Sequence, residues 1–180
     1  MSPVFKSHAR YWGQIAVFGD YMPWGVHLAN GGNKASYPEF SGRILDLKDG
    51  KDNATPYFNE RIEPELQDGI VIVVVPSHDP AKLGGGLKKL AGVLAQNGKR
   101  VDGSDCLVRT QKIDKLARGG DRSKDVHMRS VSVARPDLIK GQHVLLLDDV
   151  AKTGNSLSAG RDLLLAAGAQ SVECATIGKT

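Results

Sequence analysis

The chain contains little cysteine and no long apolar run, and we expect no export signal. Only two cysteines, Cys106 and Cys174, occur among 180 residues, so we expect neither a disulfide framework nor a structural zinc site. The longest apolar stretch, residues 70–75, is far too short to cross a bilayer. The first residues lack the apolar segment of a signal peptide. These absences predict a cytoplasmic protein with reduced thiols and no membrane partner.

Basic residues are in small excess over acidic residues. The formal net charge of +4 favours anionic partners but does not by itself indicate nucleic acid. Residues 109–129 have a local net charge of +4, equal to the excess of the whole chain, because three acids stand against seven bases: Arg109, Lys112, Lys115, Arg118, Arg122, Lys124 and Arg129. A nucleic-acid partner stays open, although no DNA-binding helix motif is present.

Aromatic residues are absent from the last two thirds of the chain, and this divides the sequence near residue 66. All ten lie between Phe5 and Phe58. In this first part, turn sequences at residues 30–33 and 48–53 separate the half-apolar runs 43–47 and 54–58, a pattern typical of short strands. We therefore expect a small β-rich lobe or hood at residues 1–65 and a separate core at residues 66–180.

The second part alternates strand and helix signals, which predicts an α/β fold with a parallel twisted sheet flanked by helices. Residues 70–75 form a continuous β-branched run closed by Pro76, as in a strand buried on both faces. The other expected elements are a helix at 81–97, strands at 106–108, 130–134 and 143–147, a helix at 156–167 and a strand at 172–177.

Two acids, Asp148 and Asp149, follow the buried strand at 143–147. The carboxyl edge of a parallel sheet is where ligands bind in this architecture. The next residues, 153–156, lead into a helix whose first N–H groups carry about half a positive charge, a ready site for an anion. Carboxylates for ribose hydroxyls or Mg²⁺, beside a phosphate site, indicate a sugar-phosphate ligand.

Two other families end a strand in acids, and neither fits. A Walker-B strand needs a Walker-A loop, but the best candidate, residues 92–100, has one residue too many and Arg100 where a hydroxyl should meet Mg²⁺. A receiver domain has its acid pair near the start of its fold, whereas Asp148 and Asp149 precede the last helix and strand.

Residues 144–156 resemble the 5-phosphoribosyl diphosphate signature of type I phosphoribosyltransferases: an apolar strand, two acids, two small or apolar residues, a variable residue, Thr-Gly and a closing Ser or Thr. The resemblance extends over residues 70–178. Within it, residues 75–78, residues 109–111, Leu116 and Arg122 look most like the branch that contains the competence protein ComF.

The resemblance implies a role for each matching residue. Asp148 and Asp149 would hold the ribose hydroxyls and Mg²⁺ and, with His78, take part in catalysis. The 5-phosphate would lie on Ala151, Lys152, Thr153, Gly154, Asn155 and Ser156. Pro76, Ser77 and His78 would form the diphosphate loop, which in this family often carries a non-proline cis peptide, and Arg109 would bind the diphosphate at the start of a closing basic loop. A histidine without a role and a solvated polar connection are the alternatives for His78 and the basic segment.

The implied activity is Mg²⁺-dependent transfer of phosphoribosyl from 5-phosphoribosyl diphosphate to a nitrogen acceptor. Lys152 stands where enzymes acting on 6-oxopurines place an acid, which disfavours guanine and hypoxanthine as acceptors. Gly84, Gly85 and Gly86 replace an Arg-Gly-Phe-Asn type sequence of the ComF branch, and the zinc ribbon of that branch is absent. The partners of ComF proteins therefore cannot be assigned to this protein by analogy. A homo-oligomer or larger complex stays open.

Two further functions stay open beside the transferase. The same pocket would serve a non-catalytic sensor of 5-phosphoribosyl diphosphate or a nucleotide, or an effector subunit of a bacterial system that attacks nucleotides or nucleic acid. The acceptor is not readable from the sequence. Candidates to stack on it all lie in the first part: Tyr11, Trp12, Phe18, Tyr21, Trp24, Tyr37, Phe40, Tyr57 and Phe58.

Overall fold

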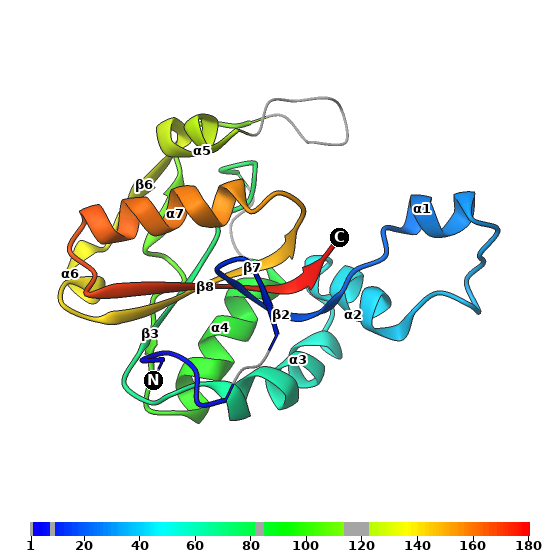
Figure 1. Ribbon diagram of the computed structural model, residues 1–180, viewed down its shortest axis with the longest axis horizontal. Helices are drawn as coiled ribbons and strands as arrows, with labels where there is room; N and C mark the ends of the chain where they lie inside the picture. Colours follow the sequence, from blue (N-terminus) through cyan, green and yellow to red (C-terminus); the bar gives the residue numbers. More distant parts are fainter. Residues whose placement is uncertain (1, 8–9, 82–84, 114–122) are drawn as a thin grey trace.

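A computed structural model describes residues 2–7, 10–81, 85–113 and 123–180. Its centre is a six-stranded sheet in the order β1-β2-β8-β7-β3-β4 (Figure 1). The strands are β1 (Tyr11–Trp12), β2 (Ile15–Asp20), β8 (Ser171–Lys179), β7 (His143–Ala151), β3 (Val71–Val74) and β4 (Val101–Asp102). All neighbouring strands pair in parallel except β1 and β2. The α/β fold class expected from the alternating pattern is confirmed.

Helices cover both faces of the sheet. On one face α2 (Glu39–Lys48), α3 (Ala54–Ile62) and α4 (Gly86–Asn97) form a core with the buried side chains of Leu145 and Leu147 in β7. On the other face α7 (Asn155–Ala166) packs on Val144 and Leu146 of the same strand. Successive residues of a strand point to opposite faces, so the continuous apolar run in β7 serves two cores at once.

A separate two-stranded ribbon lies beside α7. The strands expected at 106–108 and 130–134 are β5 (Leu107–Arg109) and β6 (Val131–Val133), which pair with each other in antiparallel fashion instead of joining the main sheet. Around β6 lie α5 (Lys124–Ser130) and α6 (Pro136–Ile139). Among the described residues, no helix combines the length and the apolar character needed to cross a membrane.

The expectation of a β-rich N-terminal lobe is wrong in its secondary structure. The runs 43–47 and 54–58, expected as strands, lie in α2 and α3. Ile44 and Leu47 are three residues apart, and Phe58 and Ile62 are four apart, and all four are buried. This is the spacing of residues on one face of a helix. The runs 43–47 and 54–58 are each too short to show this spacing clearly. The first part also contains α1 (Trp24–Ala29) and the 3₁₀ turn at Glu63–Glu65.

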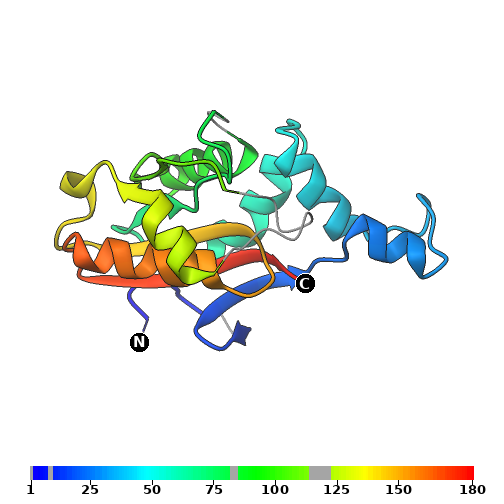
Figure 2. The same ribbon diagram turned by 90° about the horizontal axis from the view of Figure 1, so that it is seen from above.

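The N-terminal part shares its structure with the core. Strand β2 lies in the main sheet beside β8, and Phe58 and Ile62 of α3 belong to the same apolar core as Leu145 of β7. The division of the chain at residue 65 therefore stays a prediction. Within the described residues of this part, α1 projects beyond α2 (Figure 2). Its Trp24, Val26 and Leu28 side chains are exposed.

Candidate functional site

The parallel pairing of β3 and β7 brings the two expected ligand loops to one edge of the sheet. Val74 pairs with Leu147, and the Val75 amide donates to the Leu147 carbonyl at 2.9 Å. Residues 76–78 and the acid pair 148–149 each follow directly after these positions. Two loops at the carboxyl ends of adjacent parallel strands form the usual position for a ligand site in this fold class.

Asp148 is nearly buried at the end of β7, with 9% of its surface exposed. Its Oδ2 accepts a 3.0 Å hydrogen bond from the Ser156 hydroxyl, and its Oδ1 accepts one of 2.9 Å from the Asp149 amide. Burial, and after it the charge of Asp149, raises the pKa of Asp148 to about 7, because both disfavour the ionised form. This carboxyl therefore responds strongly to any cation or hydroxyl placed beside it.

Asp149 is contacted from the opposite layer, by α2. The Lys48 ammonium lies 3.7 Å from Oδ2 of Asp149 and 5.4 Å from the centre of the Tyr21 ring. Burial, followed by Tyr37 and then Asp149, raises the pKa of Tyr21 to about 12, which keeps the phenol protonated. Tyr21 and Lys48 thus form the side of the site that the N-terminal part contributes.

Sequence reasoning missed Lys48, because residues 48–53 were interpreted as a turn. The helical spacing of Ile44 and Leu47 was the signal that could have placed Lys48 at the end of a helix facing the core. Tyr21 was one of nine aromatic candidates, and the structure brings it beside the acid pair.

The expected phosphate loop connects β7 to α7. Ala151 is buried and still belongs to β7, whereas Lys152 and Thr153 are exposed. Gly154 has a φ of 77° and precedes the first residue of α7, and the Asn155 amide donates to the Thr153 hydroxyl at 3.4 Å. The left-handed conformation at Gly154 suits glycine better than residues with a side chain, and it turns the chain so that the first amides of a three-turn helix face the loop.

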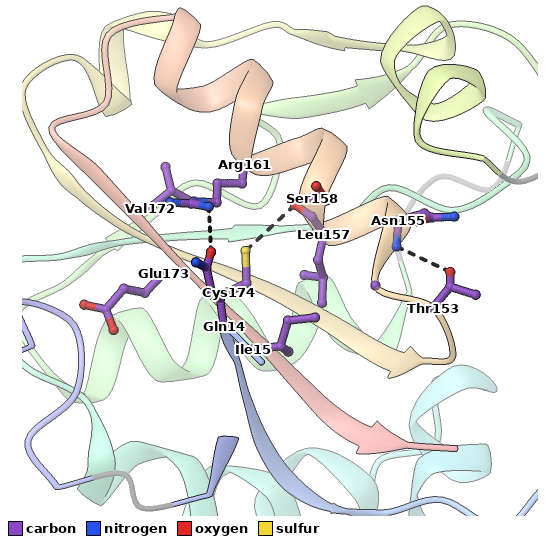
Figure 3. Close-up of a pocket in the computed structure, with 11 residues that line it drawn as sticks. Gln14, Ile15, Thr153, Asn155, Leu157, Ser158, Arg161, Val172, Glu173 and Cys174 are labelled. Carbon is purple, nitrogen blue, oxygen red and sulfur yellow. Dashed lines mark hydrogen bonds between the residues drawn. The ribbon is translucent and has the colours of Figure 1, made fainter. Parts of the chain in front are cut away.

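A cavity of about 480 Å³ lies behind this loop, between α7 and strands β2 and β8 (Figure 3). Thr153 and Asn155 lie at one end of it and Glu173 at the other. Eleven residues line it: Gln14, Ile15, Thr153, Gly154, Asn155, Leu157, Ser158, Arg161, Val172, Glu173 and Cys174. Neither acid is among them, so this cavity meets the expected site only through the loop.

The expected diphosphate loop, Pro76 to His78, is joined to the strand β5 and the residues after it. The His78 carbonyl accepts a 3.0 Å hydrogen bond from the Ile113 amide, and the Lys112 ammonium lies 3.0 Å from Asp79. The described peptide bonds are all trans, so the cis peptide implied by the family resemblance is not found in this loop. Most of the basic segment, including Lys115, Leu116, Arg118 and Arg122, lies outside the described residues.

Arg109, expected as a ligand to diphosphate, is buried beneath the loop. Only 6% of its surface is exposed, and its guanidinium donates to backbone carbonyls of the loop, 3.0 Å from Ser77 O and 3.5 Å from Pro76 O. The side chain therefore supports the loop from inside the protein.

The residues at the carboxyl edge of the sheet could hold Mg²⁺ only together with oxygen atoms of a ligand. Asp148 and Asp149 supply hard oxygen donors, but the described residues contain no group of three or more histidine, cysteine or acidic side chains that could hold a metal. Mg²⁺ typically binds one or two carboxylates together with substrate phosphates and water. The pair of acids suits an ion of this kind.

Comparisons with known proteins point to one family. The family model described as "Phosphoribosyl transferase domain" matches residues 91–179. The chain is 48% identical over 50 residues to the adenine phosphoribosyltransferase of Treponema denticola, which is 27% of this chain and 26% of that protein. It thus spans about a quarter of that relative.

Among solved structures, a purine phosphoribosyltransferase from Pyrococcus horikoshii Ot3 aligns with 91% of this chain and 88% of its own, at 15% identity and a TM-score of 0.35. The matched residues 91–179 include the acid pair, the loop after it and helix α7. Residues 91–179, just under half of the chain, are thus similar to a phosphoribosyl transferase domain.

Proposed function

We propose that this protein transfers the phosphoribosyl group of 5-phosphoribosyl diphosphate to a nitrogen acceptor and releases diphosphate. One observation carries the proposal: the nearly buried Asp148 is tied by the Ser156 hydroxyl to the start of α7, at the same sheet edge as residues 76–78. A carboxylate for the ribose, a helix start for the 5-phosphate and a neighbouring loop for the diphosphate match the three parts of this substrate.

The chemistry that the edge would support is a displacement at C1 of the ribose. The lone pair of the acceptor nitrogen forms the new bond to C1, the bond from C1 to the diphosphate oxygen breaks, and its electron pair leaves with the diphosphate. An N–H acceptor such as adenine also releases one proton, which passes to water. Positive charge builds on the ribose ring as the bond breaks. The carboxylates of Asp148 and Asp149 would stabilise this charge, and fixed carboxylates do so at little reorganisation cost.

Magnesium belongs to this proposal. Asp148 and Asp149 would hold the ion together with oxygens of the substrate, and the ion would neutralise charge that gathers on the diphosphate. A cation near the pair also lowers the pKa of Asp148 from its raised value of about 7 and keeps it ionised.

The acceptor would enter from the side of α2, where Tyr21 and Lys48 flank Asp149. An acceptor placed there could stack on the Tyr21 ring. Adenine is the first to test, because the relative that matches 50 residues is an adenine phosphoribosyltransferase. The carboxylate of an acidic residue helps to deprotonate a 6-oxopurine, and the ammonium of Lys152 cannot do this. We therefore expect guanine and hypoxanthine to be poor acceptors.

Three finer features complete the proposal. Residues 75–78 and 109–111 favour the ComF-like branch of the family. The two buried free thiols, Cys106 and Cys174, fit a reducing compartment, which supports a cytoplasmic location. His78 is proposed as a contact to the diphosphate, since it follows the two residues that Arg109 holds.

The test is release of diphosphate from 5-phosphoribosyl diphosphate, measured with Mg²⁺ over a panel of bases and nucleotides, with adenine first. We expect release with at least one acceptor, and its loss in the double variant Asp148→Asn with Asp149→Asn while circular dichroism stays unchanged. Calorimetric binding without release for any acceptor would instead indicate a sensor. Absence of binding with and without Mg²⁺ would refute both.

A further inference from the structure

Arg109, at the end of β5, reaches the loop after β3 from the inside of the protein. Its Nε donates to the Ser77 carbonyl at 3.0 Å, and its Nη2 lies 3.5 Å from the Pro76 carbonyl. One planar guanidinium therefore faces two successive carbonyls of the loop. This fork geometry is specific to arginine, because the ammonium of lysine acts as a point charge.

The guanidinium is itself held in place by helix α5. Its Nη1 donates to the Ser130 hydroxyl at 2.6 Å, and that hydroxyl donates to the Val126 carbonyl at 2.6 Å. Nδ1 of the buried His127 lies 3.4 Å from Nη2. With 6% of its surface exposed, Arg109 has few orientations open to it, so the position of the loop follows from the position of α5.

The direction of the two carbonyls determines the direction of two N–H groups. In a planar trans peptide the N–H points opposite to the C=O of the same unit, and the described peptide bonds are trans. The units that carry the Pro76 and Ser77 carbonyls also carry the Ser77 and His78 N–H groups. Because both carbonyls face Arg109, these two N–H groups point away from it.

We propose that Arg109 is a positioning residue, which orients the Ser77 and His78 amides toward the diphosphate of the substrate and does not touch the diphosphate itself. The inference rests on the proposed function. A cation bound to the carbonyl side of a peptide also polarises its N–H and makes it a better donor to an anion. The sequence places Arg109 among the ligands, whereas its burial makes it the support behind them.

The experiment compares two ligands on the full chain by calorimetry with Mg²⁺. One is 5-phosphoribosyl diphosphate, and the other is ribose 5-phosphate, which lacks the diphosphate. In Arg109→Lys, which keeps the charge and loses the fork, we expect the affinity for the first ligand to fall about 10-fold to 100-fold. Affinity for ribose 5-phosphate should stay within about twofold of the parent protein.

A matched control makes the same change elsewhere. Arg135 is exposed, and its guanidinium bonds to Asp137 at 2.9 and 2.8 Å, so Arg135→Lys should bind both ligands as the parent protein does. The milder variant Ser130→Ala loosens Arg109 without removing it. It should weaken binding of 5-phosphoribosyl diphosphate in the same selective way. If Arg109→Lys does not fold, Ser130→Ala alone tests the positioning role of Arg109.

The possible results separate the alternatives. If Arg109 contacted diphosphate through its charge, Arg109→Lys would retain most of the affinity and Ser130→Ala would retain all of it, which would overturn the proposal. Equal loss of both ligands would show a general structural role and would also overturn it. If the parent protein binds neither ligand, the proposed function itself fails, a result that is distinct from both.

Discussion

The hydroxyl of Ser156 donates a 3.0 Å hydrogen bond to Oδ2 of Asp148 and so ties the start of α7 to the end of β7. The two residues enclose the loop expected to hold the 5-phosphate. A hydrogen bond to the ionised form of a carboxyl lowers its pKa, and Ser156 does this to Asp148 against the opposite effect of burial. The tie therefore keeps Asp148 closer to ionisation than its surroundings alone would allow.

Removing this hydroxyl should be visible in the titration of Asp148. In Ser156→Ala the pKa of Asp148 should rise further above its value of about 7, because the hydrogen bond that favours the ionised form is lost. Carbon-detected NMR of the aspartate carboxyls over pH 5 to 9 measures the change. Ser158→Ala, one half-turn along α7, should leave the titration as it was. A fall in the pKa of Asp148 in Ser156→Ala would contradict this assignment.

The raised pKa of Asp148 also predicts how stability depends on pH. The folded pKa, about 7, lies above the ordinary value of 3.8, so between these values the folded protein binds more protons at this site than the unfolded chain. The contribution of Asp148 to stability is therefore full below pH 3.8, falls as pH rises toward 7, and stays low above it.

Asp148→Asn should remove this dependence. Without divalent cations, we expect the variant to be more stable than the parent protein at pH 8, with the difference shrinking toward pH 4. Urea unfolding of both proteins across this range gives the difference directly, and other titrating groups cancel in it. A difference that is constant with pH would count against a raised pKa.

Lys48 should matter for the reaction more than for the fold. Its pair with Asp149 is about one third exposed on both sides, and such pairs contribute about 1 kcal/mol or less. Lys48→Met should therefore unfold within about 1 kcal/mol of the parent protein while the KM for the acceptor rises severalfold. Steady-state kinetics and urea unfolding measure the two effects.

The control for Lys48 lies three residues further along. Lys51 pairs with Asp46 at 2.6 Å, on the exposed side of the same segment, so Lys51→Met should leave the KM unchanged. If both variants shift the KM alike, the effect comes from general surface charge, and this would contradict the proposal that Lys48 lies beside the acceptor.

Gly154→Ala should disturb the phosphate loop for two separable reasons. Its φ of 77° is costly for alanine, and an added Cβ would lie 2.9 Å from Cδ1 of Ile15. We expect a loss of stability of about 1 to 2 kcal/mol from the backbone alone, a further loss from the contact, and weaker binding of ribose 5-phosphate. Urea unfolding and calorimetry measure these.

Gly13 supplies the matched comparison. It has a φ of 59°, and a Cβ there would meet no atom within 4 Å, so Gly13→Ala should show the backbone cost without the contact and without an effect on ligand affinity. Equal losses of stability and affinity in both variants would mean that the loop around Gly154 has no special role.

The sequence predicted the parts of the fold whose signals are local and strong. The run at residues 70–75 and the strand before Asp148 are continuous apolar segments, which are typical of a strand buried on both faces. The acid pair and Gly154 lie within seven residues of the chain, so their order alone predicted the candidate site. Tyr21 and Lys48 come from distant segments, and their approach to Asp149 depends on tertiary packing.

Arg109 shows a different limit of sequence reasoning. Its position before a basic segment favoured direct binding of an anion, and the sequence contained no sign that its side chain would be buried beneath Pro76 and Ser77. The helices α2 and α3 were missed for a related reason. Their apolar residues follow a helical period, but each run was short enough to be interpreted as a strand between turns.

The pairing of β2 with β8 has a consequence for synthesis on the ribosome. In this parallel pair Ile15 lies opposite Cys174, and Val17 lies opposite Thr176. These partners are translated long after β2 has emerged, and pairing between such distant segments is slow because a large loop must close first. Until then β2 presents an open edge to other chains, so a nascent chain halted before β8 should be prone to aggregation.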